Sequence, residues 1–187
     1  MVLVGEGIRL EPLSQEHAQG LYSRGRFEPD WAYMPRACFV DAADVRHWID
    51  EAHATPGHVA FAIVESARGR VAGSTRYLNI RPAHRSLEIG WTWLGQDYQR
   101  TAVNTEAKLL LMTHAFERLG CIRVEFKTDA RNARSQQALE RIGARREGVL
   151  RNHMIVQGGY RRDSVFFSVT EEEWPEVKQR LRDMCRR

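Results

Sequence analysis

The segment LEIGWTWLGQDYQRTAVNTEAKLLLMTHAFERLG, residues 87–120, decides the fold that we expect for this chain. Leu87–Leu94 is rich in aliphatic, aromatic and β-branched residues, and it predicts a strand that ends at Gly95. From Thr105 onwards apolar residues recur with helical spacing as far as Gly120, which is a good residue just past a helix end. The segment therefore predicts a strand, a turn and a long amphipathic helix.

The predicted helix has an apolar and a polar face. Its two inward rows are Ala107, Leu111 and Ala115, and beside them Leu109, Met112, Phe116 and Leu119. The residues expected on the outward face are Glu106, Lys108, Thr113, Glu117 and Arg118. Asn104 or Thr105 can cap the start of the helix. The turn before it, residues 99–104, leaves backbone N–H groups at the positive end of the helix dipole, which suits a phosphate or pyrophosphate.

Length and composition favour one globular domain over residues 1–187. Hydrophobic residues make up 43% and charged residues 28% of the chain, which is ordinary for a soluble protein. No apolar run approaches the roughly 18 residues of a membrane span. The N-terminal MVLVGEGIRLEP has neither a basic leader nor a cleavage site, so we expect a cytoplasmic protein. Three widely spaced cysteines predict no disulfide framework.

The net charge is +4 and the pI is about 9.2. This excess suits an anionic cofactor or an acidic partner as well as nucleic acid. The arginines are scattered and do not alternate with aromatic residues, so we do not expect nucleic acid as the primary ligand. The seven histidines show no metal-ligand spacing, and we expect no metal.

Periodicity and turn residues predict the remaining elements. Strands are expected at 8–13, 58–64, 71–80, 87–94, 122–128, 145–156 and 160–169. Helices are expected at 14–24, 41–54 and 132–143, in the segment before Gly120, and from Glu171 onwards. Residues 27–40 are irregular and contain Trp31 and Tyr33, which either cover the core or form the wall of a substrate pocket.

The turn at Gln99, Ala102 and Asn104 resembles the pyrophosphate motif of the GNAT superfamily of acyl-CoA N-acyltransferases, Q/R-x-x-G-x-G/A. The element order is also similar to the GNAT fold. The resemblance implies an α+β fold with a mixed, mostly antiparallel central sheet of about seven strands, splayed at the fourth and fifth and flanked by helices. Ala102 departs from the motif, and it costs roughly 1 kcal/mol or more if the turn needs a positive φ there.

Further motifs resemble the Rim-type branch, which includes ribosomal-protein N-terminal acetyltransferases. They are Glu88-Ile89-Gly90-Trp91, Asn132-Ala133-Arg134-Ser135, Ile142-Gly143-Ala144 and Glu147-Gly148-Val149-Leu150-Arg151. The family likeness implies that acetyl-CoA is the co-substrate. Its pantetheine would lie along the backbone of Trp91, Thr92, Trp93 and Leu94. Its pyrophosphate would bind at Gln99, Arg100, Thr101, Ala102, Val103, Asn104 and Thr105, and Asn132 and Ser135 would reach the arm or its acetyl end.

The resemblance also implies the catalytic candidates. Glu88 is the candidate base, and the alternative is a structural partner for Arg76 or Arg85. Many members of the family use a Tyr as the acid, but the matching position is Leu139, so the Rim-type Ser at Ser135 is the candidate acid. The alternative for Ser135 is a hydroxyl that satisfies the first turn of its helix.

A Glu that some Rim-type members place on the next strand corresponds here to Met154. Strand alternation makes it doubtful that the neighbouring His153 faces the cleft, so we expect it to shape the acceptor site or to lie at the surface. Together with Trp31 and Tyr33 it is a candidate for substrate binding.

The resemblance implies an acetyl-CoA-dependent N-acetyltransferase whose acceptor is a primary amine, either a protein N-terminus or a small molecule. A second alternative is an acyl-CoA-binding regulator without catalysis. Pairing into a homodimer through an edge strand or the last hairpin remains open.

Overall fold

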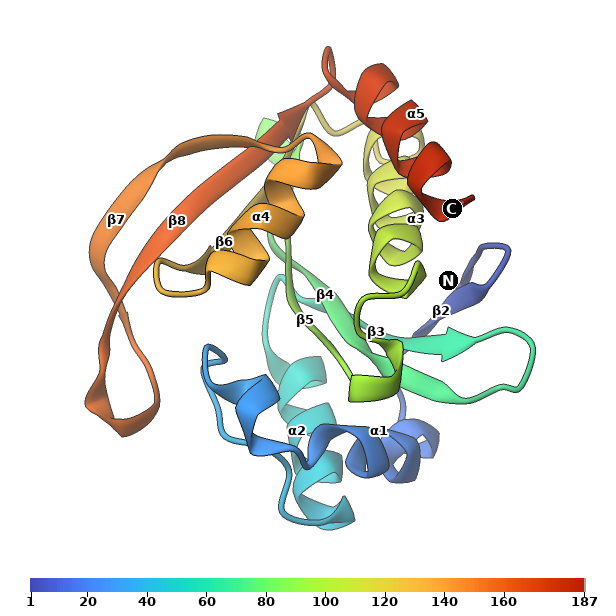
Figure 1. The fold of residues 1–187 in the computed structure, drawn as a ribbon, viewed down its shortest axis with the longest axis vertical. Coiled ribbons are helices and arrows are strands. Elements are labelled where there is room, and N and C mark those ends of the chain that lie inside the picture. Colours follow the sequence, from blue (N-terminus) through green and yellow to red (C-terminus); the bar gives the residue numbers. More distant parts are fainter. Residues whose placement is uncertain (187) are drawn as a thin grey trace.

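The computed structural model describes residues 1–186 and contains an eight-stranded sheet in the order β1-β2-β3-β4-β5-β6-β8-β7 (Figure 1). The strands are β1 Leu3–Val4, β2 Ile8–Pro12, β3 Val59–Glu65, β4 Val71–Arg81, β5 Ser86–Leu94, β6 Arg123–Asp129, β7 Arg145–Ile155 and β8 Arg161–Thr170. The helices are α1 Ala18–Gly25, α2 Ala42–Ala54, α3 Val103–Glu117, α4 Ala133–Ile142 and α5 Trp174–Cys185. The predicted α+β fold is confirmed, and β1 is an additional short strand that pairs with β2.

Every pair of neighbouring strands is antiparallel except β5 and β6, which are parallel. Their pairing covers three residues on each strand, Ser86–Glu88 against Arg123–Glu125. Beyond Glu88 the two strands part. The predicted splay between the fourth and fifth strands of the expected sheet is thus present, between β5 and β6.

Two apolar clusters cover the two faces of the sheet. The larger one joins α3, α4 and α5 to residues such as Leu87, Ile89 and Phe126. The smaller one joins α1 and α2 to Trp93 and to the small residues of β3. Glu88 lies between Leu87 and Ile89, so its side chain points to the face opposite α3. The remaining part of that face extends along the β7–β8 hairpin, which curls away from the body of the sheet (Figure 1).

The predicted outward face of α3 is wrong at two positions. Glu106 is 8% and Lys108 is 6% exposed. Glu106 accepts hydrogen bonds from the backbone of Gly7, which belongs to the segment between β1 and β2. Helical spacing did not reveal this because the N-terminal strands and the parted strands surround the first turns of α3 on sides that an isolated amphipathic helix would expose to water.

Candidate active site

The gap between β5 and β6 is the centre of the candidate site. Past Glu88 the backbone of β5 that faces β6 has no ladder partner, so its N–H and C=O groups need other partners. Trp91 has a φ of +50°, a left-handed conformation that is uncommon for a large residue. The pairing of β5 with β4 shifts register in the same region, between Ser74 and Arg76. A bulge of this kind often lies beside an active site and re-aims side chains.

The loop between β5 and α3 is held in place by Gln99. Its side-chain amide donates to the Leu94 carbonyl at 3.0 Å and to Asp30 Oδ1 at 2.8 Å. Its amide oxygen accepts a hydrogen bond from Arg134 at 2.9 Å. The side chain of Gln99 therefore ties β5, the segment before α2 and the first turn of α4 together around the predicted pyrophosphate loop.

Ala102 adopts a helical conformation, with φ −66° and ψ −15°. A methyl group is tolerated there, and the strain that a positive φ would have caused does not arise. The left-handed residue of the loop is Arg100, with a φ of +61°.

The helix α3 begins at Val103, so the predicted caps Asn104 and Thr105 are wrong: both lie inside its first turn. Ala102 occupies the cap position and supplies no side-chain acceptor. Thr101 Oγ1 accepts a 3.3 Å hydrogen bond from the Val103 N–H. Asn104 Oδ1 is buried without a partner among residues 1–186. Apart from the Val103 N–H, the first N–H groups of α3 have neither a side-chain cap nor an intrahelical partner, which fits an anionic ligand.

Glu88 is 1% exposed, and its two oxygens have different surroundings. Oε2 accepts hydrogen bonds from Asn79 Nδ2 at 2.8 Å and from Lys127 Nζ at 3.1 Å. Oε1 is buried and has no partner within the described residues. One oxygen therefore fixes the carboxylate while the other stays free to accept a proton or hydrogen bond.

The predicted structural partners of Glu88, Arg76 and Arg85, are wrong. The Arg76 guanidinium lies between the rings of Trp48 and Trp91, at 4.6 and 4.7 Å from their centres. Burial lowers the pKa of Arg76 to about 10. Arg85 donates instead to the carbonyl of Gly120.

His153 lies on the same face of the sheet as Glu88. Its Nδ1 is 3.0 Å from Ser164 Oγ, and its ring packs edge-on against Phe166, which pairs with Lys127 across β6 and β8. Burial and then the charge of Lys127 lower the pKa of His153. The argument from simple alternation fails, because Asn152 has a φ of +49° and the β7–β8 pairing shifts there. Of the two alternatives for His153, the structure disfavours the surface position, and a role in the acceptor site stays a prediction.

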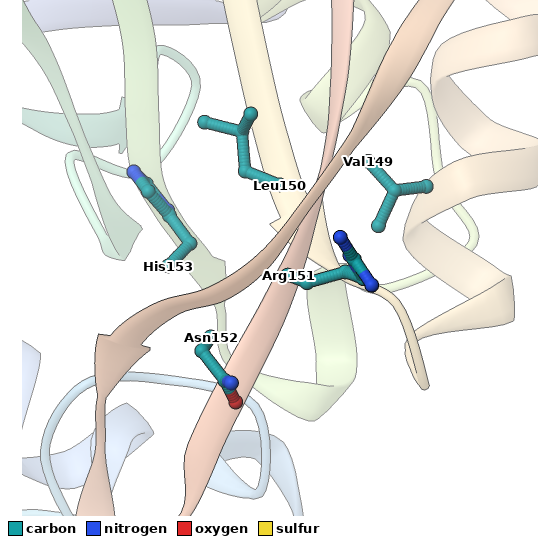
Figure 2. Close-up of a pocket in the computed structure, with 5 residues that line it drawn as sticks. All are labelled: Val149, Leu150, Arg151, Asn152 and His153. Carbon is teal, nitrogen blue, oxygen red and sulfur yellow. The ribbon is translucent and has the colours of Figure 1, made fainter.

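An open hollow of about 660 Å³ lies along this part of β7. Figure 2 shows its lining residues, with His153 and Arg151 leaving the strand on opposite sides. The lining residues are Val149, Leu150, Arg151, Asn152 and His153. The hollow is thus formed by a single segment of β7, which includes His153.

The start of α4 contains the other predicted residues. Asn132 is the N-cap of α4, and its Oδ1 accepts a 3.0 Å hydrogen bond from the Ser135 backbone N–H. The Ser135 side chain is half-buried and has no hydrogen-bond partner within residues 1–186. The amide nitrogen of Asn132 and the hydroxyl of Ser135 are therefore both available to a ligand.

The segment before α2 and the tip of the β7–β8 hairpin are in contact. Gln157 Nε2 donates to the carbonyls of Trp31 at 3.0 Å, Met34 at 2.8 Å and Arg36. The Trp31 side chain is 1% exposed and packs against Phe39 and Trp93, so the ring covers the core.

Tyr33, by contrast, is exposed, and its ring lies 5.6 Å from the Arg131 guanidinium. Arg131 also stacks on Tyr160 at 3.6 Å and pairs with Asp129 at 2.7 Å. These contacts and those of Gln157 make the hairpin and the loop into an arch beside the parted strands.

Sequence reasoning missed four polar residues of this region. Asn79 and Lys127 hold Glu88, Lys108 lies in the gap, and Gln157 closes the arch. Lys127 could have been found from the sequence. It lies two residues after Glu125 on β6, so the two side chains are on the same face, and Glu125 is the residue that pairs with Glu88. Asn79 and Gln157 gave no signal, since each acts through a contact with a distant segment.

No helix within residues 1–186 is long and apolar enough to cross a membrane. The same residues contain no group of three or more His, Cys, Asp or Glu side chains that suits a metal ion.

The parted parallel strands, the start of α3 without a side-chain cap from Ala102 and the half-satisfied Glu88 carboxylate are the features that distinguish this site. The family model for the acetyltransferase (GNAT) domain matches residues 8–145. The chain belongs to the GNAT acetyltransferase family.

Two curated relatives come from Bacillus subtilis (strain 168). The chain is 32% identical over 106 residues to a protein provisionally named ribosomal N-acetyltransferase YdaF, and the alignment covers 57% of each chain. It is 29% identical over 89 residues to the uncharacterized N-acetyltransferase YnaD, covering 48% of this chain and 51% of that protein. The chain thus spans about half the length of the curated relatives it matches.

The crystal structure of a GCN5-related N-acetyltransferase from Brucella melitensis superimposes with a TM-score of 0.93 at 34% identity. This match covers 98% of the present chain and 84% of the other. The structure of Mycobacterium smegmatis RimJ in complex with CoA-disulfide gives a TM-score of 0.78 at 22% identity, covering 94% and 88% of the two chains. At that identity the likeness to RimJ concerns the fold alone.

Proposed function

We propose that this protein is an acetyl-CoA-dependent N-acetyltransferase that moves an acetyl group directly to a primary amine. The observation that carries the proposal is Glu88, a buried carboxylate with one oxygen held by Asn79 and Lys127 and the other without a partner in the described part of the chain. It lies where β5 and β6 begin to part. A buried polar atom left unsatisfied is costly and often marks a functional position.

The residues around the gap fit acyl-CoA. The helical Ala102 and the uncapped start of α3 accommodate a pyrophosphate, to which Arg100 adds positive charge. The free backbone edge at Trp91–Leu94 suits the amides of a pantetheine arm. We expect the Asn132 amide and the Ser135 hydroxyl, at the start of α4, to contact that arm, since neither has another partner within residues 1–186. When bound, the co-substrate supplies an activated thioester.

Glu88 takes the proton of the acceptor amine, directly or through a water molecule. An α-amino group has a pKa of about 7.7–8.0, so a carboxylate base suffices, whereas a lysine amine near 10.4 demands more. Transfer within one complex then depends on positioning, and no covalent intermediate on the protein is needed. Ser135, whose hydroxyl has no partner within residues 1–186, is a candidate hydrogen-bond donor to the pantetheine arm.

A protein N-terminus is the acceptor that we favour. The contact of Gln157 with the segment before α2 joins the tip of the β7–β8 hairpin to that segment, and we expect an extended peptide end to enter beneath this arch towards Glu88. We expect Tyr33, which is exposed beside Arg131, and His153, which lies beside Ser164, to contact the acceptor. The ribosomal N-acetyltransferase name of one relative supports a protein substrate.

Two measurements test the proposal. Acetyl-CoA at about 100 times its dissociation constant should stabilise the protein against thermal unfolding by roughly 2.7 kcal/mol. Mass spectrometry should then show acetylation of N-terminal peptides in preference to small amines. Transfer to small amines alone would replace the peptide acceptor with a small-molecule one. Stabilisation without transfer to any amine would favour the acyl-CoA-binding regulator.

A further inference from the structure

Lys108 is a buried cation that has no counter-ion among the residues that the structure describes. It lies on the second turn of α3, and its Nζ donates to Thr92 Oγ1 at 2.9 Å. Thr92 Oγ1 is in turn 2.8 Å from Thr75 Oγ1, and the Lys108 Nζ lies 5.7 Å from the centre of the Phe126 ring. Within residues 1–186 Lys108 forms no ion pair, and its nearest acidic neighbour along α3, Glu106, binds Gly7 instead. Burying an unpaired ammonium is costly, so stability does not explain this residue.

The position of Lys108 is defined by the parted strands. Phe126 directly follows Glu125, the last residue of β6 that pairs with β5. Thr92 lies on β5 just beyond the left-handed Trp91. Lys108 therefore reaches the gap from the α3 face of the sheet, near the end where β5 and β6 are still paired. Glu88 reaches the same end from the opposite face.

We propose that Lys108 is the proton donor for the sulfur that leaves when the acetyl group is transferred, an inference that rests on the proposed function. Glu88 then acts on the acceptor amine and Lys108 on the leaving sulfur, from opposite faces of the sheet. The amine takes its place on the Glu88 face, and Lys108 lies beside the arm that carries the sulfur.

The proposed step balances. A bond forms between the acceptor nitrogen and the carbonyl carbon, and the carbon–sulfur bond breaks with its electron pair going to sulfur. Lys108 donates a proton to that sulfur, and Glu88 or water removes one from the nitrogen. Lys108 regains its proton from solvent after the products leave.

Two observations support this assignment. Burial lowers the pKa of Lys108 from 10.5 to about 8, and no charged neighbour contributes to the shift. A thiol such as that of cysteine has a pKa of about 8.5, so donor and acceptor are matched. The second observation is Leu139, which occupies the position of the family's Tyr. It is 7% exposed and packs in the core, so it supplies no proton.

The first test is the ionisation of the CoA thiol itself, which requires no acceptor. The ultraviolet absorbance of the thiolate would be followed against pH for CoA bound to the wild type, to Lys108→Met and to the control Lys178→Met. A neighbouring cation lowers a thiol pKa, so the bound thiol should ionise about one pH unit lower in the wild type and control than in Lys108→Met.

The outcomes separate this inference from the proposed function. CoA that binds with the same thiol pKa in all three proteins overturns the role of Lys108 and leaves the acetyltransferase proposal in place. Failure of the wild type to bind CoA at millimolar concentration overturns both.

The second test is the pH profile of kcat with an N-terminal peptide. In the wild type kcat should fall as the pH rises through about 8, because the neutral amine of Lys108 cannot donate. Lys108→Met should lower kcat roughly 100-fold while the Kd of acetyl-CoA changes by about threefold or less. Lys108→Arg should lack the fall above pH 8, since a guanidinium stays protonated. A rise in KM for acetyl-CoA with an unchanged kcat profile would instead show a purely structural role.

Discussion

At the gap between β5 and β6, the charged side chains on the two faces of the sheet have different surroundings. On the α3 face a single cation, Lys108, lies among threonine hydroxyls and an aromatic ring. On the other face Glu88 belongs to a polar network with Asn79 and Lys127, close to His153. The loss of a proton from an isolated buried group directly changes activity and stability. In a hydrogen-bonded network, the neighbouring groups compensate part of that change. Substitutions on the two faces should therefore give different signatures.

The largest effect is expected at Glu88. Glu88→Gln keeps the shape and the contact of its side chain but removes the base, so kcat should fall roughly 100-fold to 1,000-fold. The matched control is Glu125→Gln on β6, directly opposite, whose carboxylate is already paired with Arg81 and Arg123. Steady-state kinetics of acetyl transfer would measure both. Equal losses in the two variants would contradict a special role for Glu88.

The next largest effect is expected in the loop between β5 and α3. Ala102 is exposed and helical at the uncapped start of α3. Ala102→Trp should fill the space required by a pyrophosphate and remove most of the roughly 2.7 kcal/mol of stabilisation that saturating acetyl-CoA provides. Ala67→Trp, at an exposed alanine in the β3–β4 turn, is the control. Thermal unfolding with and without acetyl-CoA is the measurement. If acetyl-CoA stabilised Ala102→Trp as much as the wild type, the ligand would have to bind elsewhere.

The buried cation predicts a pH dependence of stability. Between about pH 8 and 10.5 the unfolded chain keeps the Lys108 proton and the folded protein releases it, so the free energy of unfolding should rise with pH in this interval. Lys108→Met should lack this rise and be more stable at pH 7 by roughly 3 kcal/mol, since the pKa is lowered by about 2.5 units at 1.36 kcal/mol each. Urea unfolding at several pH values is the measurement, with Lys178→Met as control. A less stable Lys108→Met at pH 7 would refute the cost assigned to burial.

The smallest effect is expected at the arch. Gln157→Ala removes an amide that donates to carbonyls of the segment before α2 and should destabilise the fold by about 1 kcal/mol. Its main consequence should be a higher KM for a peptide acceptor with acetyl-CoA affinity unchanged. Gln179→Ala, on the exposed face of α5, provides the comparison. An unchanged peptide KM would exclude the arch from acceptor binding.

The sequence alone determined the order of the elements and the strand–turn–helix unit. These follow from local periodicity and turn residues, which act within a few positions along the chain. The place of the splay was implied by the resemblance to the GNAT family. It also singled out Glu88, because the motif that contains it is contiguous. The helical conformation of Ala102 was an open question in the sequence, since alanine is compatible with more than one turn geometry.

Tertiary structure alone decided the surroundings of the charges. The burial of Glu106 and Lys108 depends on strands that lie far away in the chain, and helical spacing could not show it. The orientation of His153 depends on a bulge at Asn152 whose register is set by pairing with β8. The partners of Glu88 come from β4 and β6, and Gln157 is fixed by a segment more than 120 residues away. Electrostatic environment is a property of packing, because the free energy of a charge depends on the atoms that replace its water.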